Sequence, residues 1–116
     1  MRNDKENLIV KLTLEFALEI IKYTEFLETH KKFIIAKQLL KSGTSIGANV
    51  REAQNAESKL DFIHKLKIAA KEADETEYWI TLCEMSENYP SPENLKEKLT
   101  SIRNVLSKII STTKSN

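Results

Sequence analysis

The chain has only two glycines and two prolines among 116 residues, and this scarcity favours long uninterrupted elements. β-Strands need frequent turns, which glycine and proline usually supply. Leucine, isoleucine, alanine, glutamate and lysine are abundant instead, and most of these side chains favour helices. The length suits one hydrophobic core rather than two. We therefore expect a single all-α domain over residues 1–116.

Apolar residues recur at steps of three and four in four segments, as they do on the buried side of an amphipathic helix. The segments predict helices at about 4–28, 32–56, 59–88 and 92–111. Short connections place successive helices antiparallel, so the expected architecture is an antiparallel up-down-up-down four-helix bundle. The inward positions expected in the last helix are Leu95, Leu99, Ile102, Leu106 and Ile109.

The run 88–92, Asn-Tyr-Pro-Ser-Pro, is the clearest boundary between helices. Proline cannot continue a helix, and it restricts the residue before it. Ser91 and Pro92 then match the N-cap and the first position of a new helix. The Ser/Thr/Lys-rich tail after Ile110 is expected to fray.

Cysteine usage and hydropathy bear on the location of the protein. The single cysteine, Cys83, cannot form an internal disulfide, and no secretory leader pattern opens the sequence. The longest apolar runs fall far short of the roughly 20 residues that cross a bilayer. These features predict a cytoplasmic protein that does not span a membrane.

Both glycines, Gly43 and Gly47, fall inside the second predicted helix, together with Ser42 and Ser45. Each glycine costs about 1 kcal/mol relative to alanine in a helix interior, so a local need for small side chains is expected. Close packing against another helix or another subunit is the favoured interpretation. Contact with a ligand is the alternative.

Polar side chains also share faces of the second and third helices. Asn49 and Glu52 lie three residues apart, as do Glu72 and Glu75. Paired acids of this kind can serve hydrolysis, but hydrogen bonds that fix helix register are the favoured interpretation. No activated nucleophile accompanies them, because Cys83 falls on the apolar stripe of the third helix.

The residue pattern of a di-metal bundle is incomplete in this sequence. That site needs two Glu-x-x-His pairs, whereas only Asp61 and His64 stand at the right spacing. A glycine-rich phosphate loop following a strand is not expected either. We therefore expect no metal, no cofactor, no small-molecule substrate and no enzymatic activity.

Two runs of the sequence resemble a known family. LLKSGTSIGANVREA and DFIHKLKIAAKEADETEYWI are similar to segments of the bacterial four helix bundle proteins, also called 23S rRNA intervening-sequence proteins. The resemblance implies the same bundle, assembled as a ring-shaped homopentamer. A relative of the family, the accessory protein of diversity-generating retroelements, binds reverse transcriptase and nucleic acid, which makes nucleic acid a second candidate partner. That relative is strongly basic, whereas this chain has a formal net charge of +1.

Tyr78 and Trp79 leave the main apolar stripe of the third predicted helix. Aromatic side chains on a flank either cover the core beside a neighbouring helix or anchor an interface. An intermolecular role is slightly favoured, because a ring assembly needs apolar flanks.

Charge is distributed unevenly along the chain. Residues 31–71 hold nine Lys or Arg and three acids, whereas residues 72–93 hold seven acids and no base. An up-down-up-down bundle would then have one basic end and one acidic end. A solvated surface is the favoured interpretation, and phosphate binding or electrostatic pairing of subunits are the alternatives. The bases expected to contact nucleic acid are Arg51, Lys59, Lys65, Lys67, Arg103 and Lys108.

Overall fold

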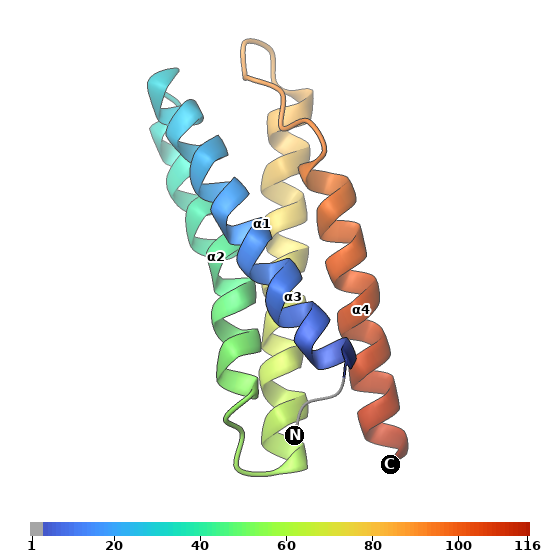
Figure 1. Ribbon diagram of the computed structural model, residues 1–116. Coiled ribbons are helices and arrows are strands. Elements are labelled where there is room, and N and C mark those ends of the chain that lie inside the picture. The colour runs from blue at the N-terminus through green and yellow to red at the C-terminus, as the bar shows by residue number, and fades with distance from the viewer. Residues whose placement is uncertain (1–3) are drawn as a thin grey trace.

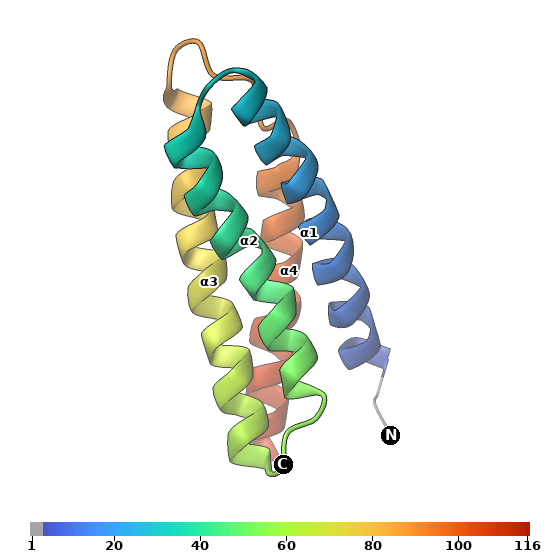
Figure 2. The same ribbon diagram turned by 90° about the vertical axis from the view of Figure 1, so that its left-hand side faces the viewer.

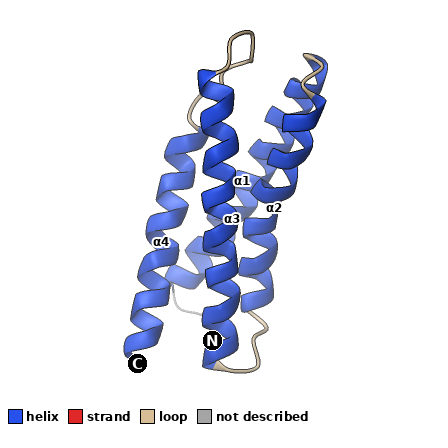
Figure 3. Ribbon diagram, turned by 180° about the vertical axis from the view of Figure 1, so that it is seen from behind, coloured by secondary structure: helices blue, strands red, loops and turns tan. Residues whose placement is uncertain are grey.

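The computed structural model describes residues 4–116, and the side chains of residues 8–116. Its four helices are α1 (Asp4–Thr29), α2 (Phe33–Ala53), α3 (Lys59–Met85) and α4 (Leu95–Ser115). Successive helices run in opposite directions, and the described residues form no strand (Figure 1, Figure 3). The predicted antiparallel four-helix bundle is therefore confirmed. In the described part of the chain, no helix is both long and apolar enough to cross a membrane.

Each helix packs against its neighbours in the chain, and α4 closes the bundle against α1. Figure 2 shows α2 in front, between α3 and α1, with α4 behind. The molecule is an elongated rod with extents of 48 × 20 × 19 Å. One end of this rod collects the start of α1, the end of α2, the start of α3 and the end of α4 (Figure 1).

The core is made of one apolar stripe from each helix. In α4, all five predicted inward side chains are at most 4% exposed. In α3, the buried positions run from Leu66 to Cys83 at the predicted steps of three and four. Helical periodicity therefore located the core of these two helices correctly.

The stripes of α1 and α3 differ from expectation at their edges. The apolar spacing predicts Leu12 and Phe62 as inward positions, but both are only half-buried, whereas the adjacent Thr13 and Ile63 are buried. Thr13 is tolerated inside because its hydroxyl donates to the Ile9 carbonyl oxygen at 2.8 Å. A threonine whose hydroxyl bonds to its own helix can thus take a buried position, although the apolar pattern predicted that the neighbouring leucine would be buried.

The boundary between α3 and α4 differs from the prediction. α3 ends at Met85 rather than at residue 88, and α4 begins at Leu95 rather than at residue 92. Glu93 has a left-handed backbone with φ of 49°, which prevents a continuous helix from Pro92. The Ser91 hydroxyl accepts a hydrogen bond from the Glu93 N–H at 3.1 Å, so it stabilises this turn and does not cap α4.

Two other helix ends were also predicted wrongly. α2 ends at Ala53 and is followed by a turn, rather than continuing to residue 56. α4 extends to Ser115 instead of fraying after Ile110. Thr113 remains half-buried, and its hydroxyl donates to the Ile109 carbonyl oxygen at 2.7 Å. The last turn therefore keeps contact with the bundle, which a polar sequence alone did not indicate.

The connection between α3 and α4 is tied back to the first half of the chain. The Tyr23 hydroxyl donates to the Pro90 carbonyl oxygen at 2.7 Å. The Lys32 ammonium lies 4.8 Å from the centroid of the Tyr89 ring, within the range of a cation–π contact. These contacts fix the position of the turn against α1 and the α1–α2 connection.

Candidate interaction surfaces

The glycines of α2 lie where α1 packs most closely against it. A Cβ atom added to Gly43 would lie 2.9 Å from both Cγ1 and Cγ2 of Ile20. A Cβ atom added to Gly47 would lie 3.3 Å from the Thr13 carbonyl oxygen. At Gly43 the space for a side chain is therefore taken up by Ile20, whereas at Gly47 the contact with α1 is tight but less severe.

Ser42 faces the other neighbour of α2. Its hydroxyl lies 2.9 Å from the Thr76 hydroxyl on α3, and both side chains are completely buried. The Thr76 hydroxyl also lies 2.7 Å from the Glu72 carbonyl oxygen. A buried hydrogen bond of this kind contributes about 1 kcal/mol and penalises any register that leaves one partner unpaired. It therefore aligns α2 with α3.

The other polar residues singled out on α2 have separate partners. The Ser45 hydroxyl donates to the Lys41 carbonyl oxygen at 2.6 Å, and the Asn49 amide donates to the Ser45 carbonyl oxygen at 2.9 Å. Glu52 instead forms an ion pair with Lys65 on α3 at 3.3 Å. Asn49 thus bonds along its own helix, whereas Glu52 crosses to the next one.

Glu72 and Glu75 differ in surroundings although they share one side of α3. Partial burial, followed by the charge of Glu75, raises the pKa of Glu72, and Lys41 on α2 opposes that rise. The Glu75 carboxylate accepts a hydrogen bond from the Trp79 indole at 3.0 Å. Glu72 therefore keeps a raised pKa despite Lys41, whereas the Glu75 carboxylate is bound by an indole.

A row of exposed apolar side chains covers the outer side of α1 and α2. Leu14 and Leu18 on α1 are 56% and 57% exposed, and Phe33 on α2 is 59% exposed. Ile21 and Leu40 extend the row and are somewhat less exposed. We call these five side chains, together with the groove between the two helices, the α1–α2 face.

The groove of the α1–α2 face has a volume of about 190 Å³. Small residues from both helices line it, together with larger side chains that include Leu14 and Arg51. The small residues are Ala17, Thr44, Gly47 and Ala48. Gly47 therefore serves two purposes, since it brings α1 close on one side and leaves an opening at the surface.

Tyr78 and Trp79 have different environments despite being adjacent. Lys65 and Glu72 both lie on the side of α3 that faces α2. Trp79 is seven residues after Glu72, which is two helical turns, so Trp79 lies on that side as well. There Trp79 is half-buried and packs against the core. Tyr78 is mostly exposed.

Tyr78 belongs to an outer strip of α3. Asp74 and Met85 stand four residues before it and seven after it, so the three share one side of the helix. Met85 is 79% exposed. We call Asp74, Tyr78 and Met85 the α3 strip.

Two of the bases expected to contact nucleic acid are already paired within the subunit. Arg103 on α4 forms ion pairs with Asp74 and with Glu77, the latter at 2.6 Å. Lys65 is paired with Glu52. The other predicted bases, Arg51, Lys59, Lys67 and Lys108, are exposed.

Lys67 faces another lysine across the seam between α3 and α4. The Lys114 side chain lowers the pKa of Lys67, first through a hydrogen bond that favours an uncharged amine and then through repulsion between like charges. At the same end of the rod, the Lys59 ammonium donates to the Asn116 carbonyl oxygen. Sequence reasoning missed Lys114, because the tail that carries it was expected to fray.

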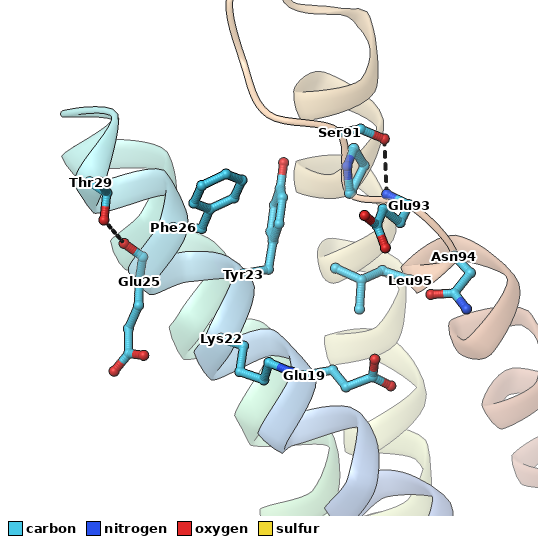
Figure 4. Close-up of a pocket in the computed structure, with 11 residues that line it drawn as sticks. Glu19, Lys22, Tyr23, Glu25, Phe26, Thr29, Ser91, Glu93, Asn94 and Leu95 are labelled. Carbon is cyan, nitrogen blue, oxygen red and sulfur yellow. Dashed lines mark hydrogen bonds between the residues drawn. The ribbon is translucent and has the colours of Figure 1, made fainter.

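A larger groove, of about 600 Å³, lies between the C-terminal half of α1 and residues 91–95. Figure 4 shows the rings of Tyr23 and Phe26 on one side, and Glu93 and Leu95 on the other. The Tyr23 hydroxyl is engaged by Pro90. This groove could not be found from the sequence, because its two walls come from opposite ends of the chain.

Cys83 is buried beside Tyr23. Burial raises the pKa of the Cys83 thiol, and the Tyr23 hydroxyl only partly offsets this effect. Burial also raises the pKa of Tyr23, with the thiol adding to the rise. Both groups therefore stay protonated at neutral pH, and Cys83 lacks the thiolate that a nucleophile needs.

We expect Cys83 to react with Ellman's reagent at least about a hundredfold more slowly in the folded protein than in denaturant, because the thiolate forms only when α3 opens locally. Cys83→Ser with Ser101→Cys is the matched control, since Ser101 is exposed on α4 and a thiol there should react quickly in both states. Equal rates for Cys83 in the two states would contradict its buried position.

Asp61 forms hydrogen bonds at the start of α3, whereas His64 faces solvent. The Ser58 hydroxyl accepts from the Asp61 N–H at 3.0 Å and caps the helix, while the Asp61 carboxylate accepts from the Glu57 N–H at 3.3 Å. His64 is exposed. Among the residues that the structure describes, no three His, Cys, Asp or Glu side chains are grouped so as to hold a metal ion.

These features define a small four-helix bundle whose distinctive positions are close helix contacts and exposed apolar surfaces. The chain belongs to the 23S rRNA-intervening sequence protein family, whose model matches residues 5–111. It is also similar to the crystal structure of a protein of unknown function from the S23 ribosomal protein family of Bacteroides thetaiotaomicron. The two are 45% identical with a TM-score of 0.87, over 92% of this chain and 98% of that one. No curated protein matches the chain.

Proposed function

We propose that this protein is a non-enzymatic assembly module that acts as a homo-oligomer, a pentamer as the family resemblance implies. The α1–α2 face is the observation that carries the proposal. Single exposed apolar side chains are normal on proteins, whereas several gathered on two adjacent helices are typical of an association site. A second subunit that removed these side chains from water would gain about 25 cal/mol for each Å² of apolar surface.

The composition of α1 supports the same proposal. One side of the helix places Phe16 and Ile20 in the core, and the other side exposes Leu14 and Leu18. A helix that is apolar on both sides is normally buried on both sides. In a monomer only the first side of α1 is covered, and a neighbouring subunit would cover the second.

We expect the protein to sediment at several times the 13.3 kDa mass of one chain. Leu14→Glu should reduce it to a monomer of unchanged helical content, because a buried unpaired charge disfavours the contact while the core stays intact. Sedimentation velocity and circular dichroism measure the two properties.

Leu60→Glu is the matched control for this substitution. Leu60 is 79% exposed at the start of α3, outside the α1–α2 face, so the variant should keep the wild-type mass. A wild-type protein that stays monomeric at every concentration would remove the proposal.

A nucleic-acid-binding accessory role, like that of the retroelement relative, is the second candidate. The arrangement of Lys67 and Lys114 favours it, because these two lysine side chains interact across the α3–α4 seam. A phosphate between them would relieve their repulsion. Lys59 lies at the same end of the rod and would add to the attraction.

For this second candidate, binding to duplex nucleic acid should weaken steeply as salt rises. Replacing both Lys67 and Lys114 by alanine should reduce the slope of log affinity against log salt by about 1.8, or roughly 0.9 for each phosphate contact. Lys96→Ala is the control, since Lys96 is paired with Glu84 at 3.1 Å near the other end of the seam. A flat salt dependence, or equal slopes for all variants, would exclude this role.

A further inference from the structure

Two exposed apolar side chains, Tyr78 and Met85, lie on the α3 strip, which is separate from the α1–α2 face. It lies on α3, the helix that does not pack against α1. If two copies paired their α1–α2 faces with each other, Tyr78 and Met85 would remain in water. A contact between the α1–α2 face of one copy and the α3 strip of the next would cover both surfaces at once.

The charges on α2 beside the α1–α2 face and the charges on α3 beside the α3 strip are opposite in sign. Between Lys31 and Arg51 the sequence has no acid, and Lys37 stands between Phe33 and Leu40 on the side of α2 that carries the α1–α2 face. From residue 72 to residue 85, α3 has no base. Asp74 lies within the α3 strip and is paired with Arg103 on α4, and Glu75 lies beside the strip and accepts from the Trp79 indole. Complementary charges of this kind fix which surfaces meet and in what orientation.

We propose that the subunits associate head to tail, with Tyr78 of one copy inserted into the groove of the α1–α2 face of the next. This inference rests on the proposed assembly and adds its geometry. The groove of about 190 Å³ has the volume of roughly six waters at about 30 Å³ each, which is room for one aromatic side chain. Arg51 lines the groove and would meet Glu75 near Tyr78, because Asp74 and Glu77 are already paired with Arg103.

Head-to-tail contact determines the symmetry of the assembly. Two different surfaces of each copy are used, so the interface is heterologous, and it gives a ring when the rotation between copies closes. A buried tyrosine with an adjacent arginine is also the composition found at the energetic centre of many interfaces. The same contact thus explains the exposed tyrosine, the groove and the segregated charges.

Variants disabled on opposite surfaces test this pairing. Leu14→Glu and Tyr78→Glu should each sediment as a monomer, because each removes one half of every contact. An equimolar mixture of the two should form a species of twice the 13.3 kDa chain mass and nothing larger. In that mixture, only the α1–α2 face of the Tyr78→Glu chain and the α3 strip of the Leu14→Glu chain are intact.

Each other outcome has a definite meaning. If Tyr78→Glu keeps the wild-type mass, the head-to-tail contact is overturned while the proposed assembly stands. A mixture that stays monomeric also overturns it, whereas a monomeric wild-type protein removes the assembly itself. Tyr78→Phe is the matched control, because it keeps the ring and should keep the wild-type mass. Unchanged helical content in every variant excludes unfolding as the cause.

Discussion

Replacing Gly43 with leucine is expected to lower the free energy of unfolding by about 3 kcal/mol. A Cβ atom at this position would already lie 2.9 Å from two carbons of Ile20, in the fully buried contact between α1 and α2. A leucine must therefore push α1 outward or force Ile20 from its rotamer. The gain of roughly 1 kcal/mol in helix propensity offsets only part of this cost.

Urea unfolding at a fixed protein concentration measures this loss, with Ile20→Ala as the informative partner. That truncation removes the three Ile20 carbons that lie nearest to the added Cβ atom. The double variant should be at least about 1 kcal/mol more stable than the sum of the two single effects predicts. Strict additivity would contradict direct contact between positions 20 and 43.

Leu66→Ala is the other substitution with a large expected effect, a loss of about 3 to 4 kcal/mol. Leu66 is completely buried on α3. Its truncation removes the transfer free energy of the lost carbons and leaves a cavity that the surrounding helices fill only in part. Urea or thermal unfolding at matched protein concentration measures the loss.

Leu60→Ala provides the matched control on the same helix. The chemical change is identical, but Leu60 is 79% exposed, so the expected change in the free energy of unfolding is within about 0.5 kcal/mol. Similar losses at positions 60 and 66 would contradict the orientation that the structure gives to α3.

Residues of α2 contribute both to packing inside the bundle and to the surface that we propose for assembly. Gly43 and Gly47 bring α1 close, Ser42 aligns α3, and Phe33 and Leu40 form part of the α1–α2 face. Gly47 also lines the groove between α1 and α2. This glycine thereby helps to shape the surface that we propose for association, whereas the contact of Gly43 with Ile20 is internal.

Several features of the bundle could be predicted because they depend on spacing along one helix. The inward side chains of α4, and the buried stripe of α3 from Leu66 to Cys83, follow directly from a period of 3.6 residues. Ser58 is an N-cap because its hydroxyl reaches an amide only three residues ahead. Such interactions are local, so the sequence contains all the information that they need.

Other features depend on contacts between distant segments. The turn before α4 is held by the bond from Tyr23 to Pro90, and its left-handed Glu93 delays the helix beyond the expected start. The separation of Tyr78 from Trp79, one exposed and one half-buried, also follows from how α3 is rotated against α2. Neither could be derived from helix propensity or from the pattern of apolar residues.

The sequence by itself determined that this chain forms four antiparallel helices around one core, because hydrophobic periodicity and helix propensity act within each helix. Only the tertiary structure decided how each helix is rotated and where it ends. It also placed Arg103 and Lys65 in ion pairs, brought Lys67 beside Lys114, and left the α1–α2 face exposed. The physical reason is that surfaces arise from contacts between helices, and those contacts depend on distances that no single helix specifies.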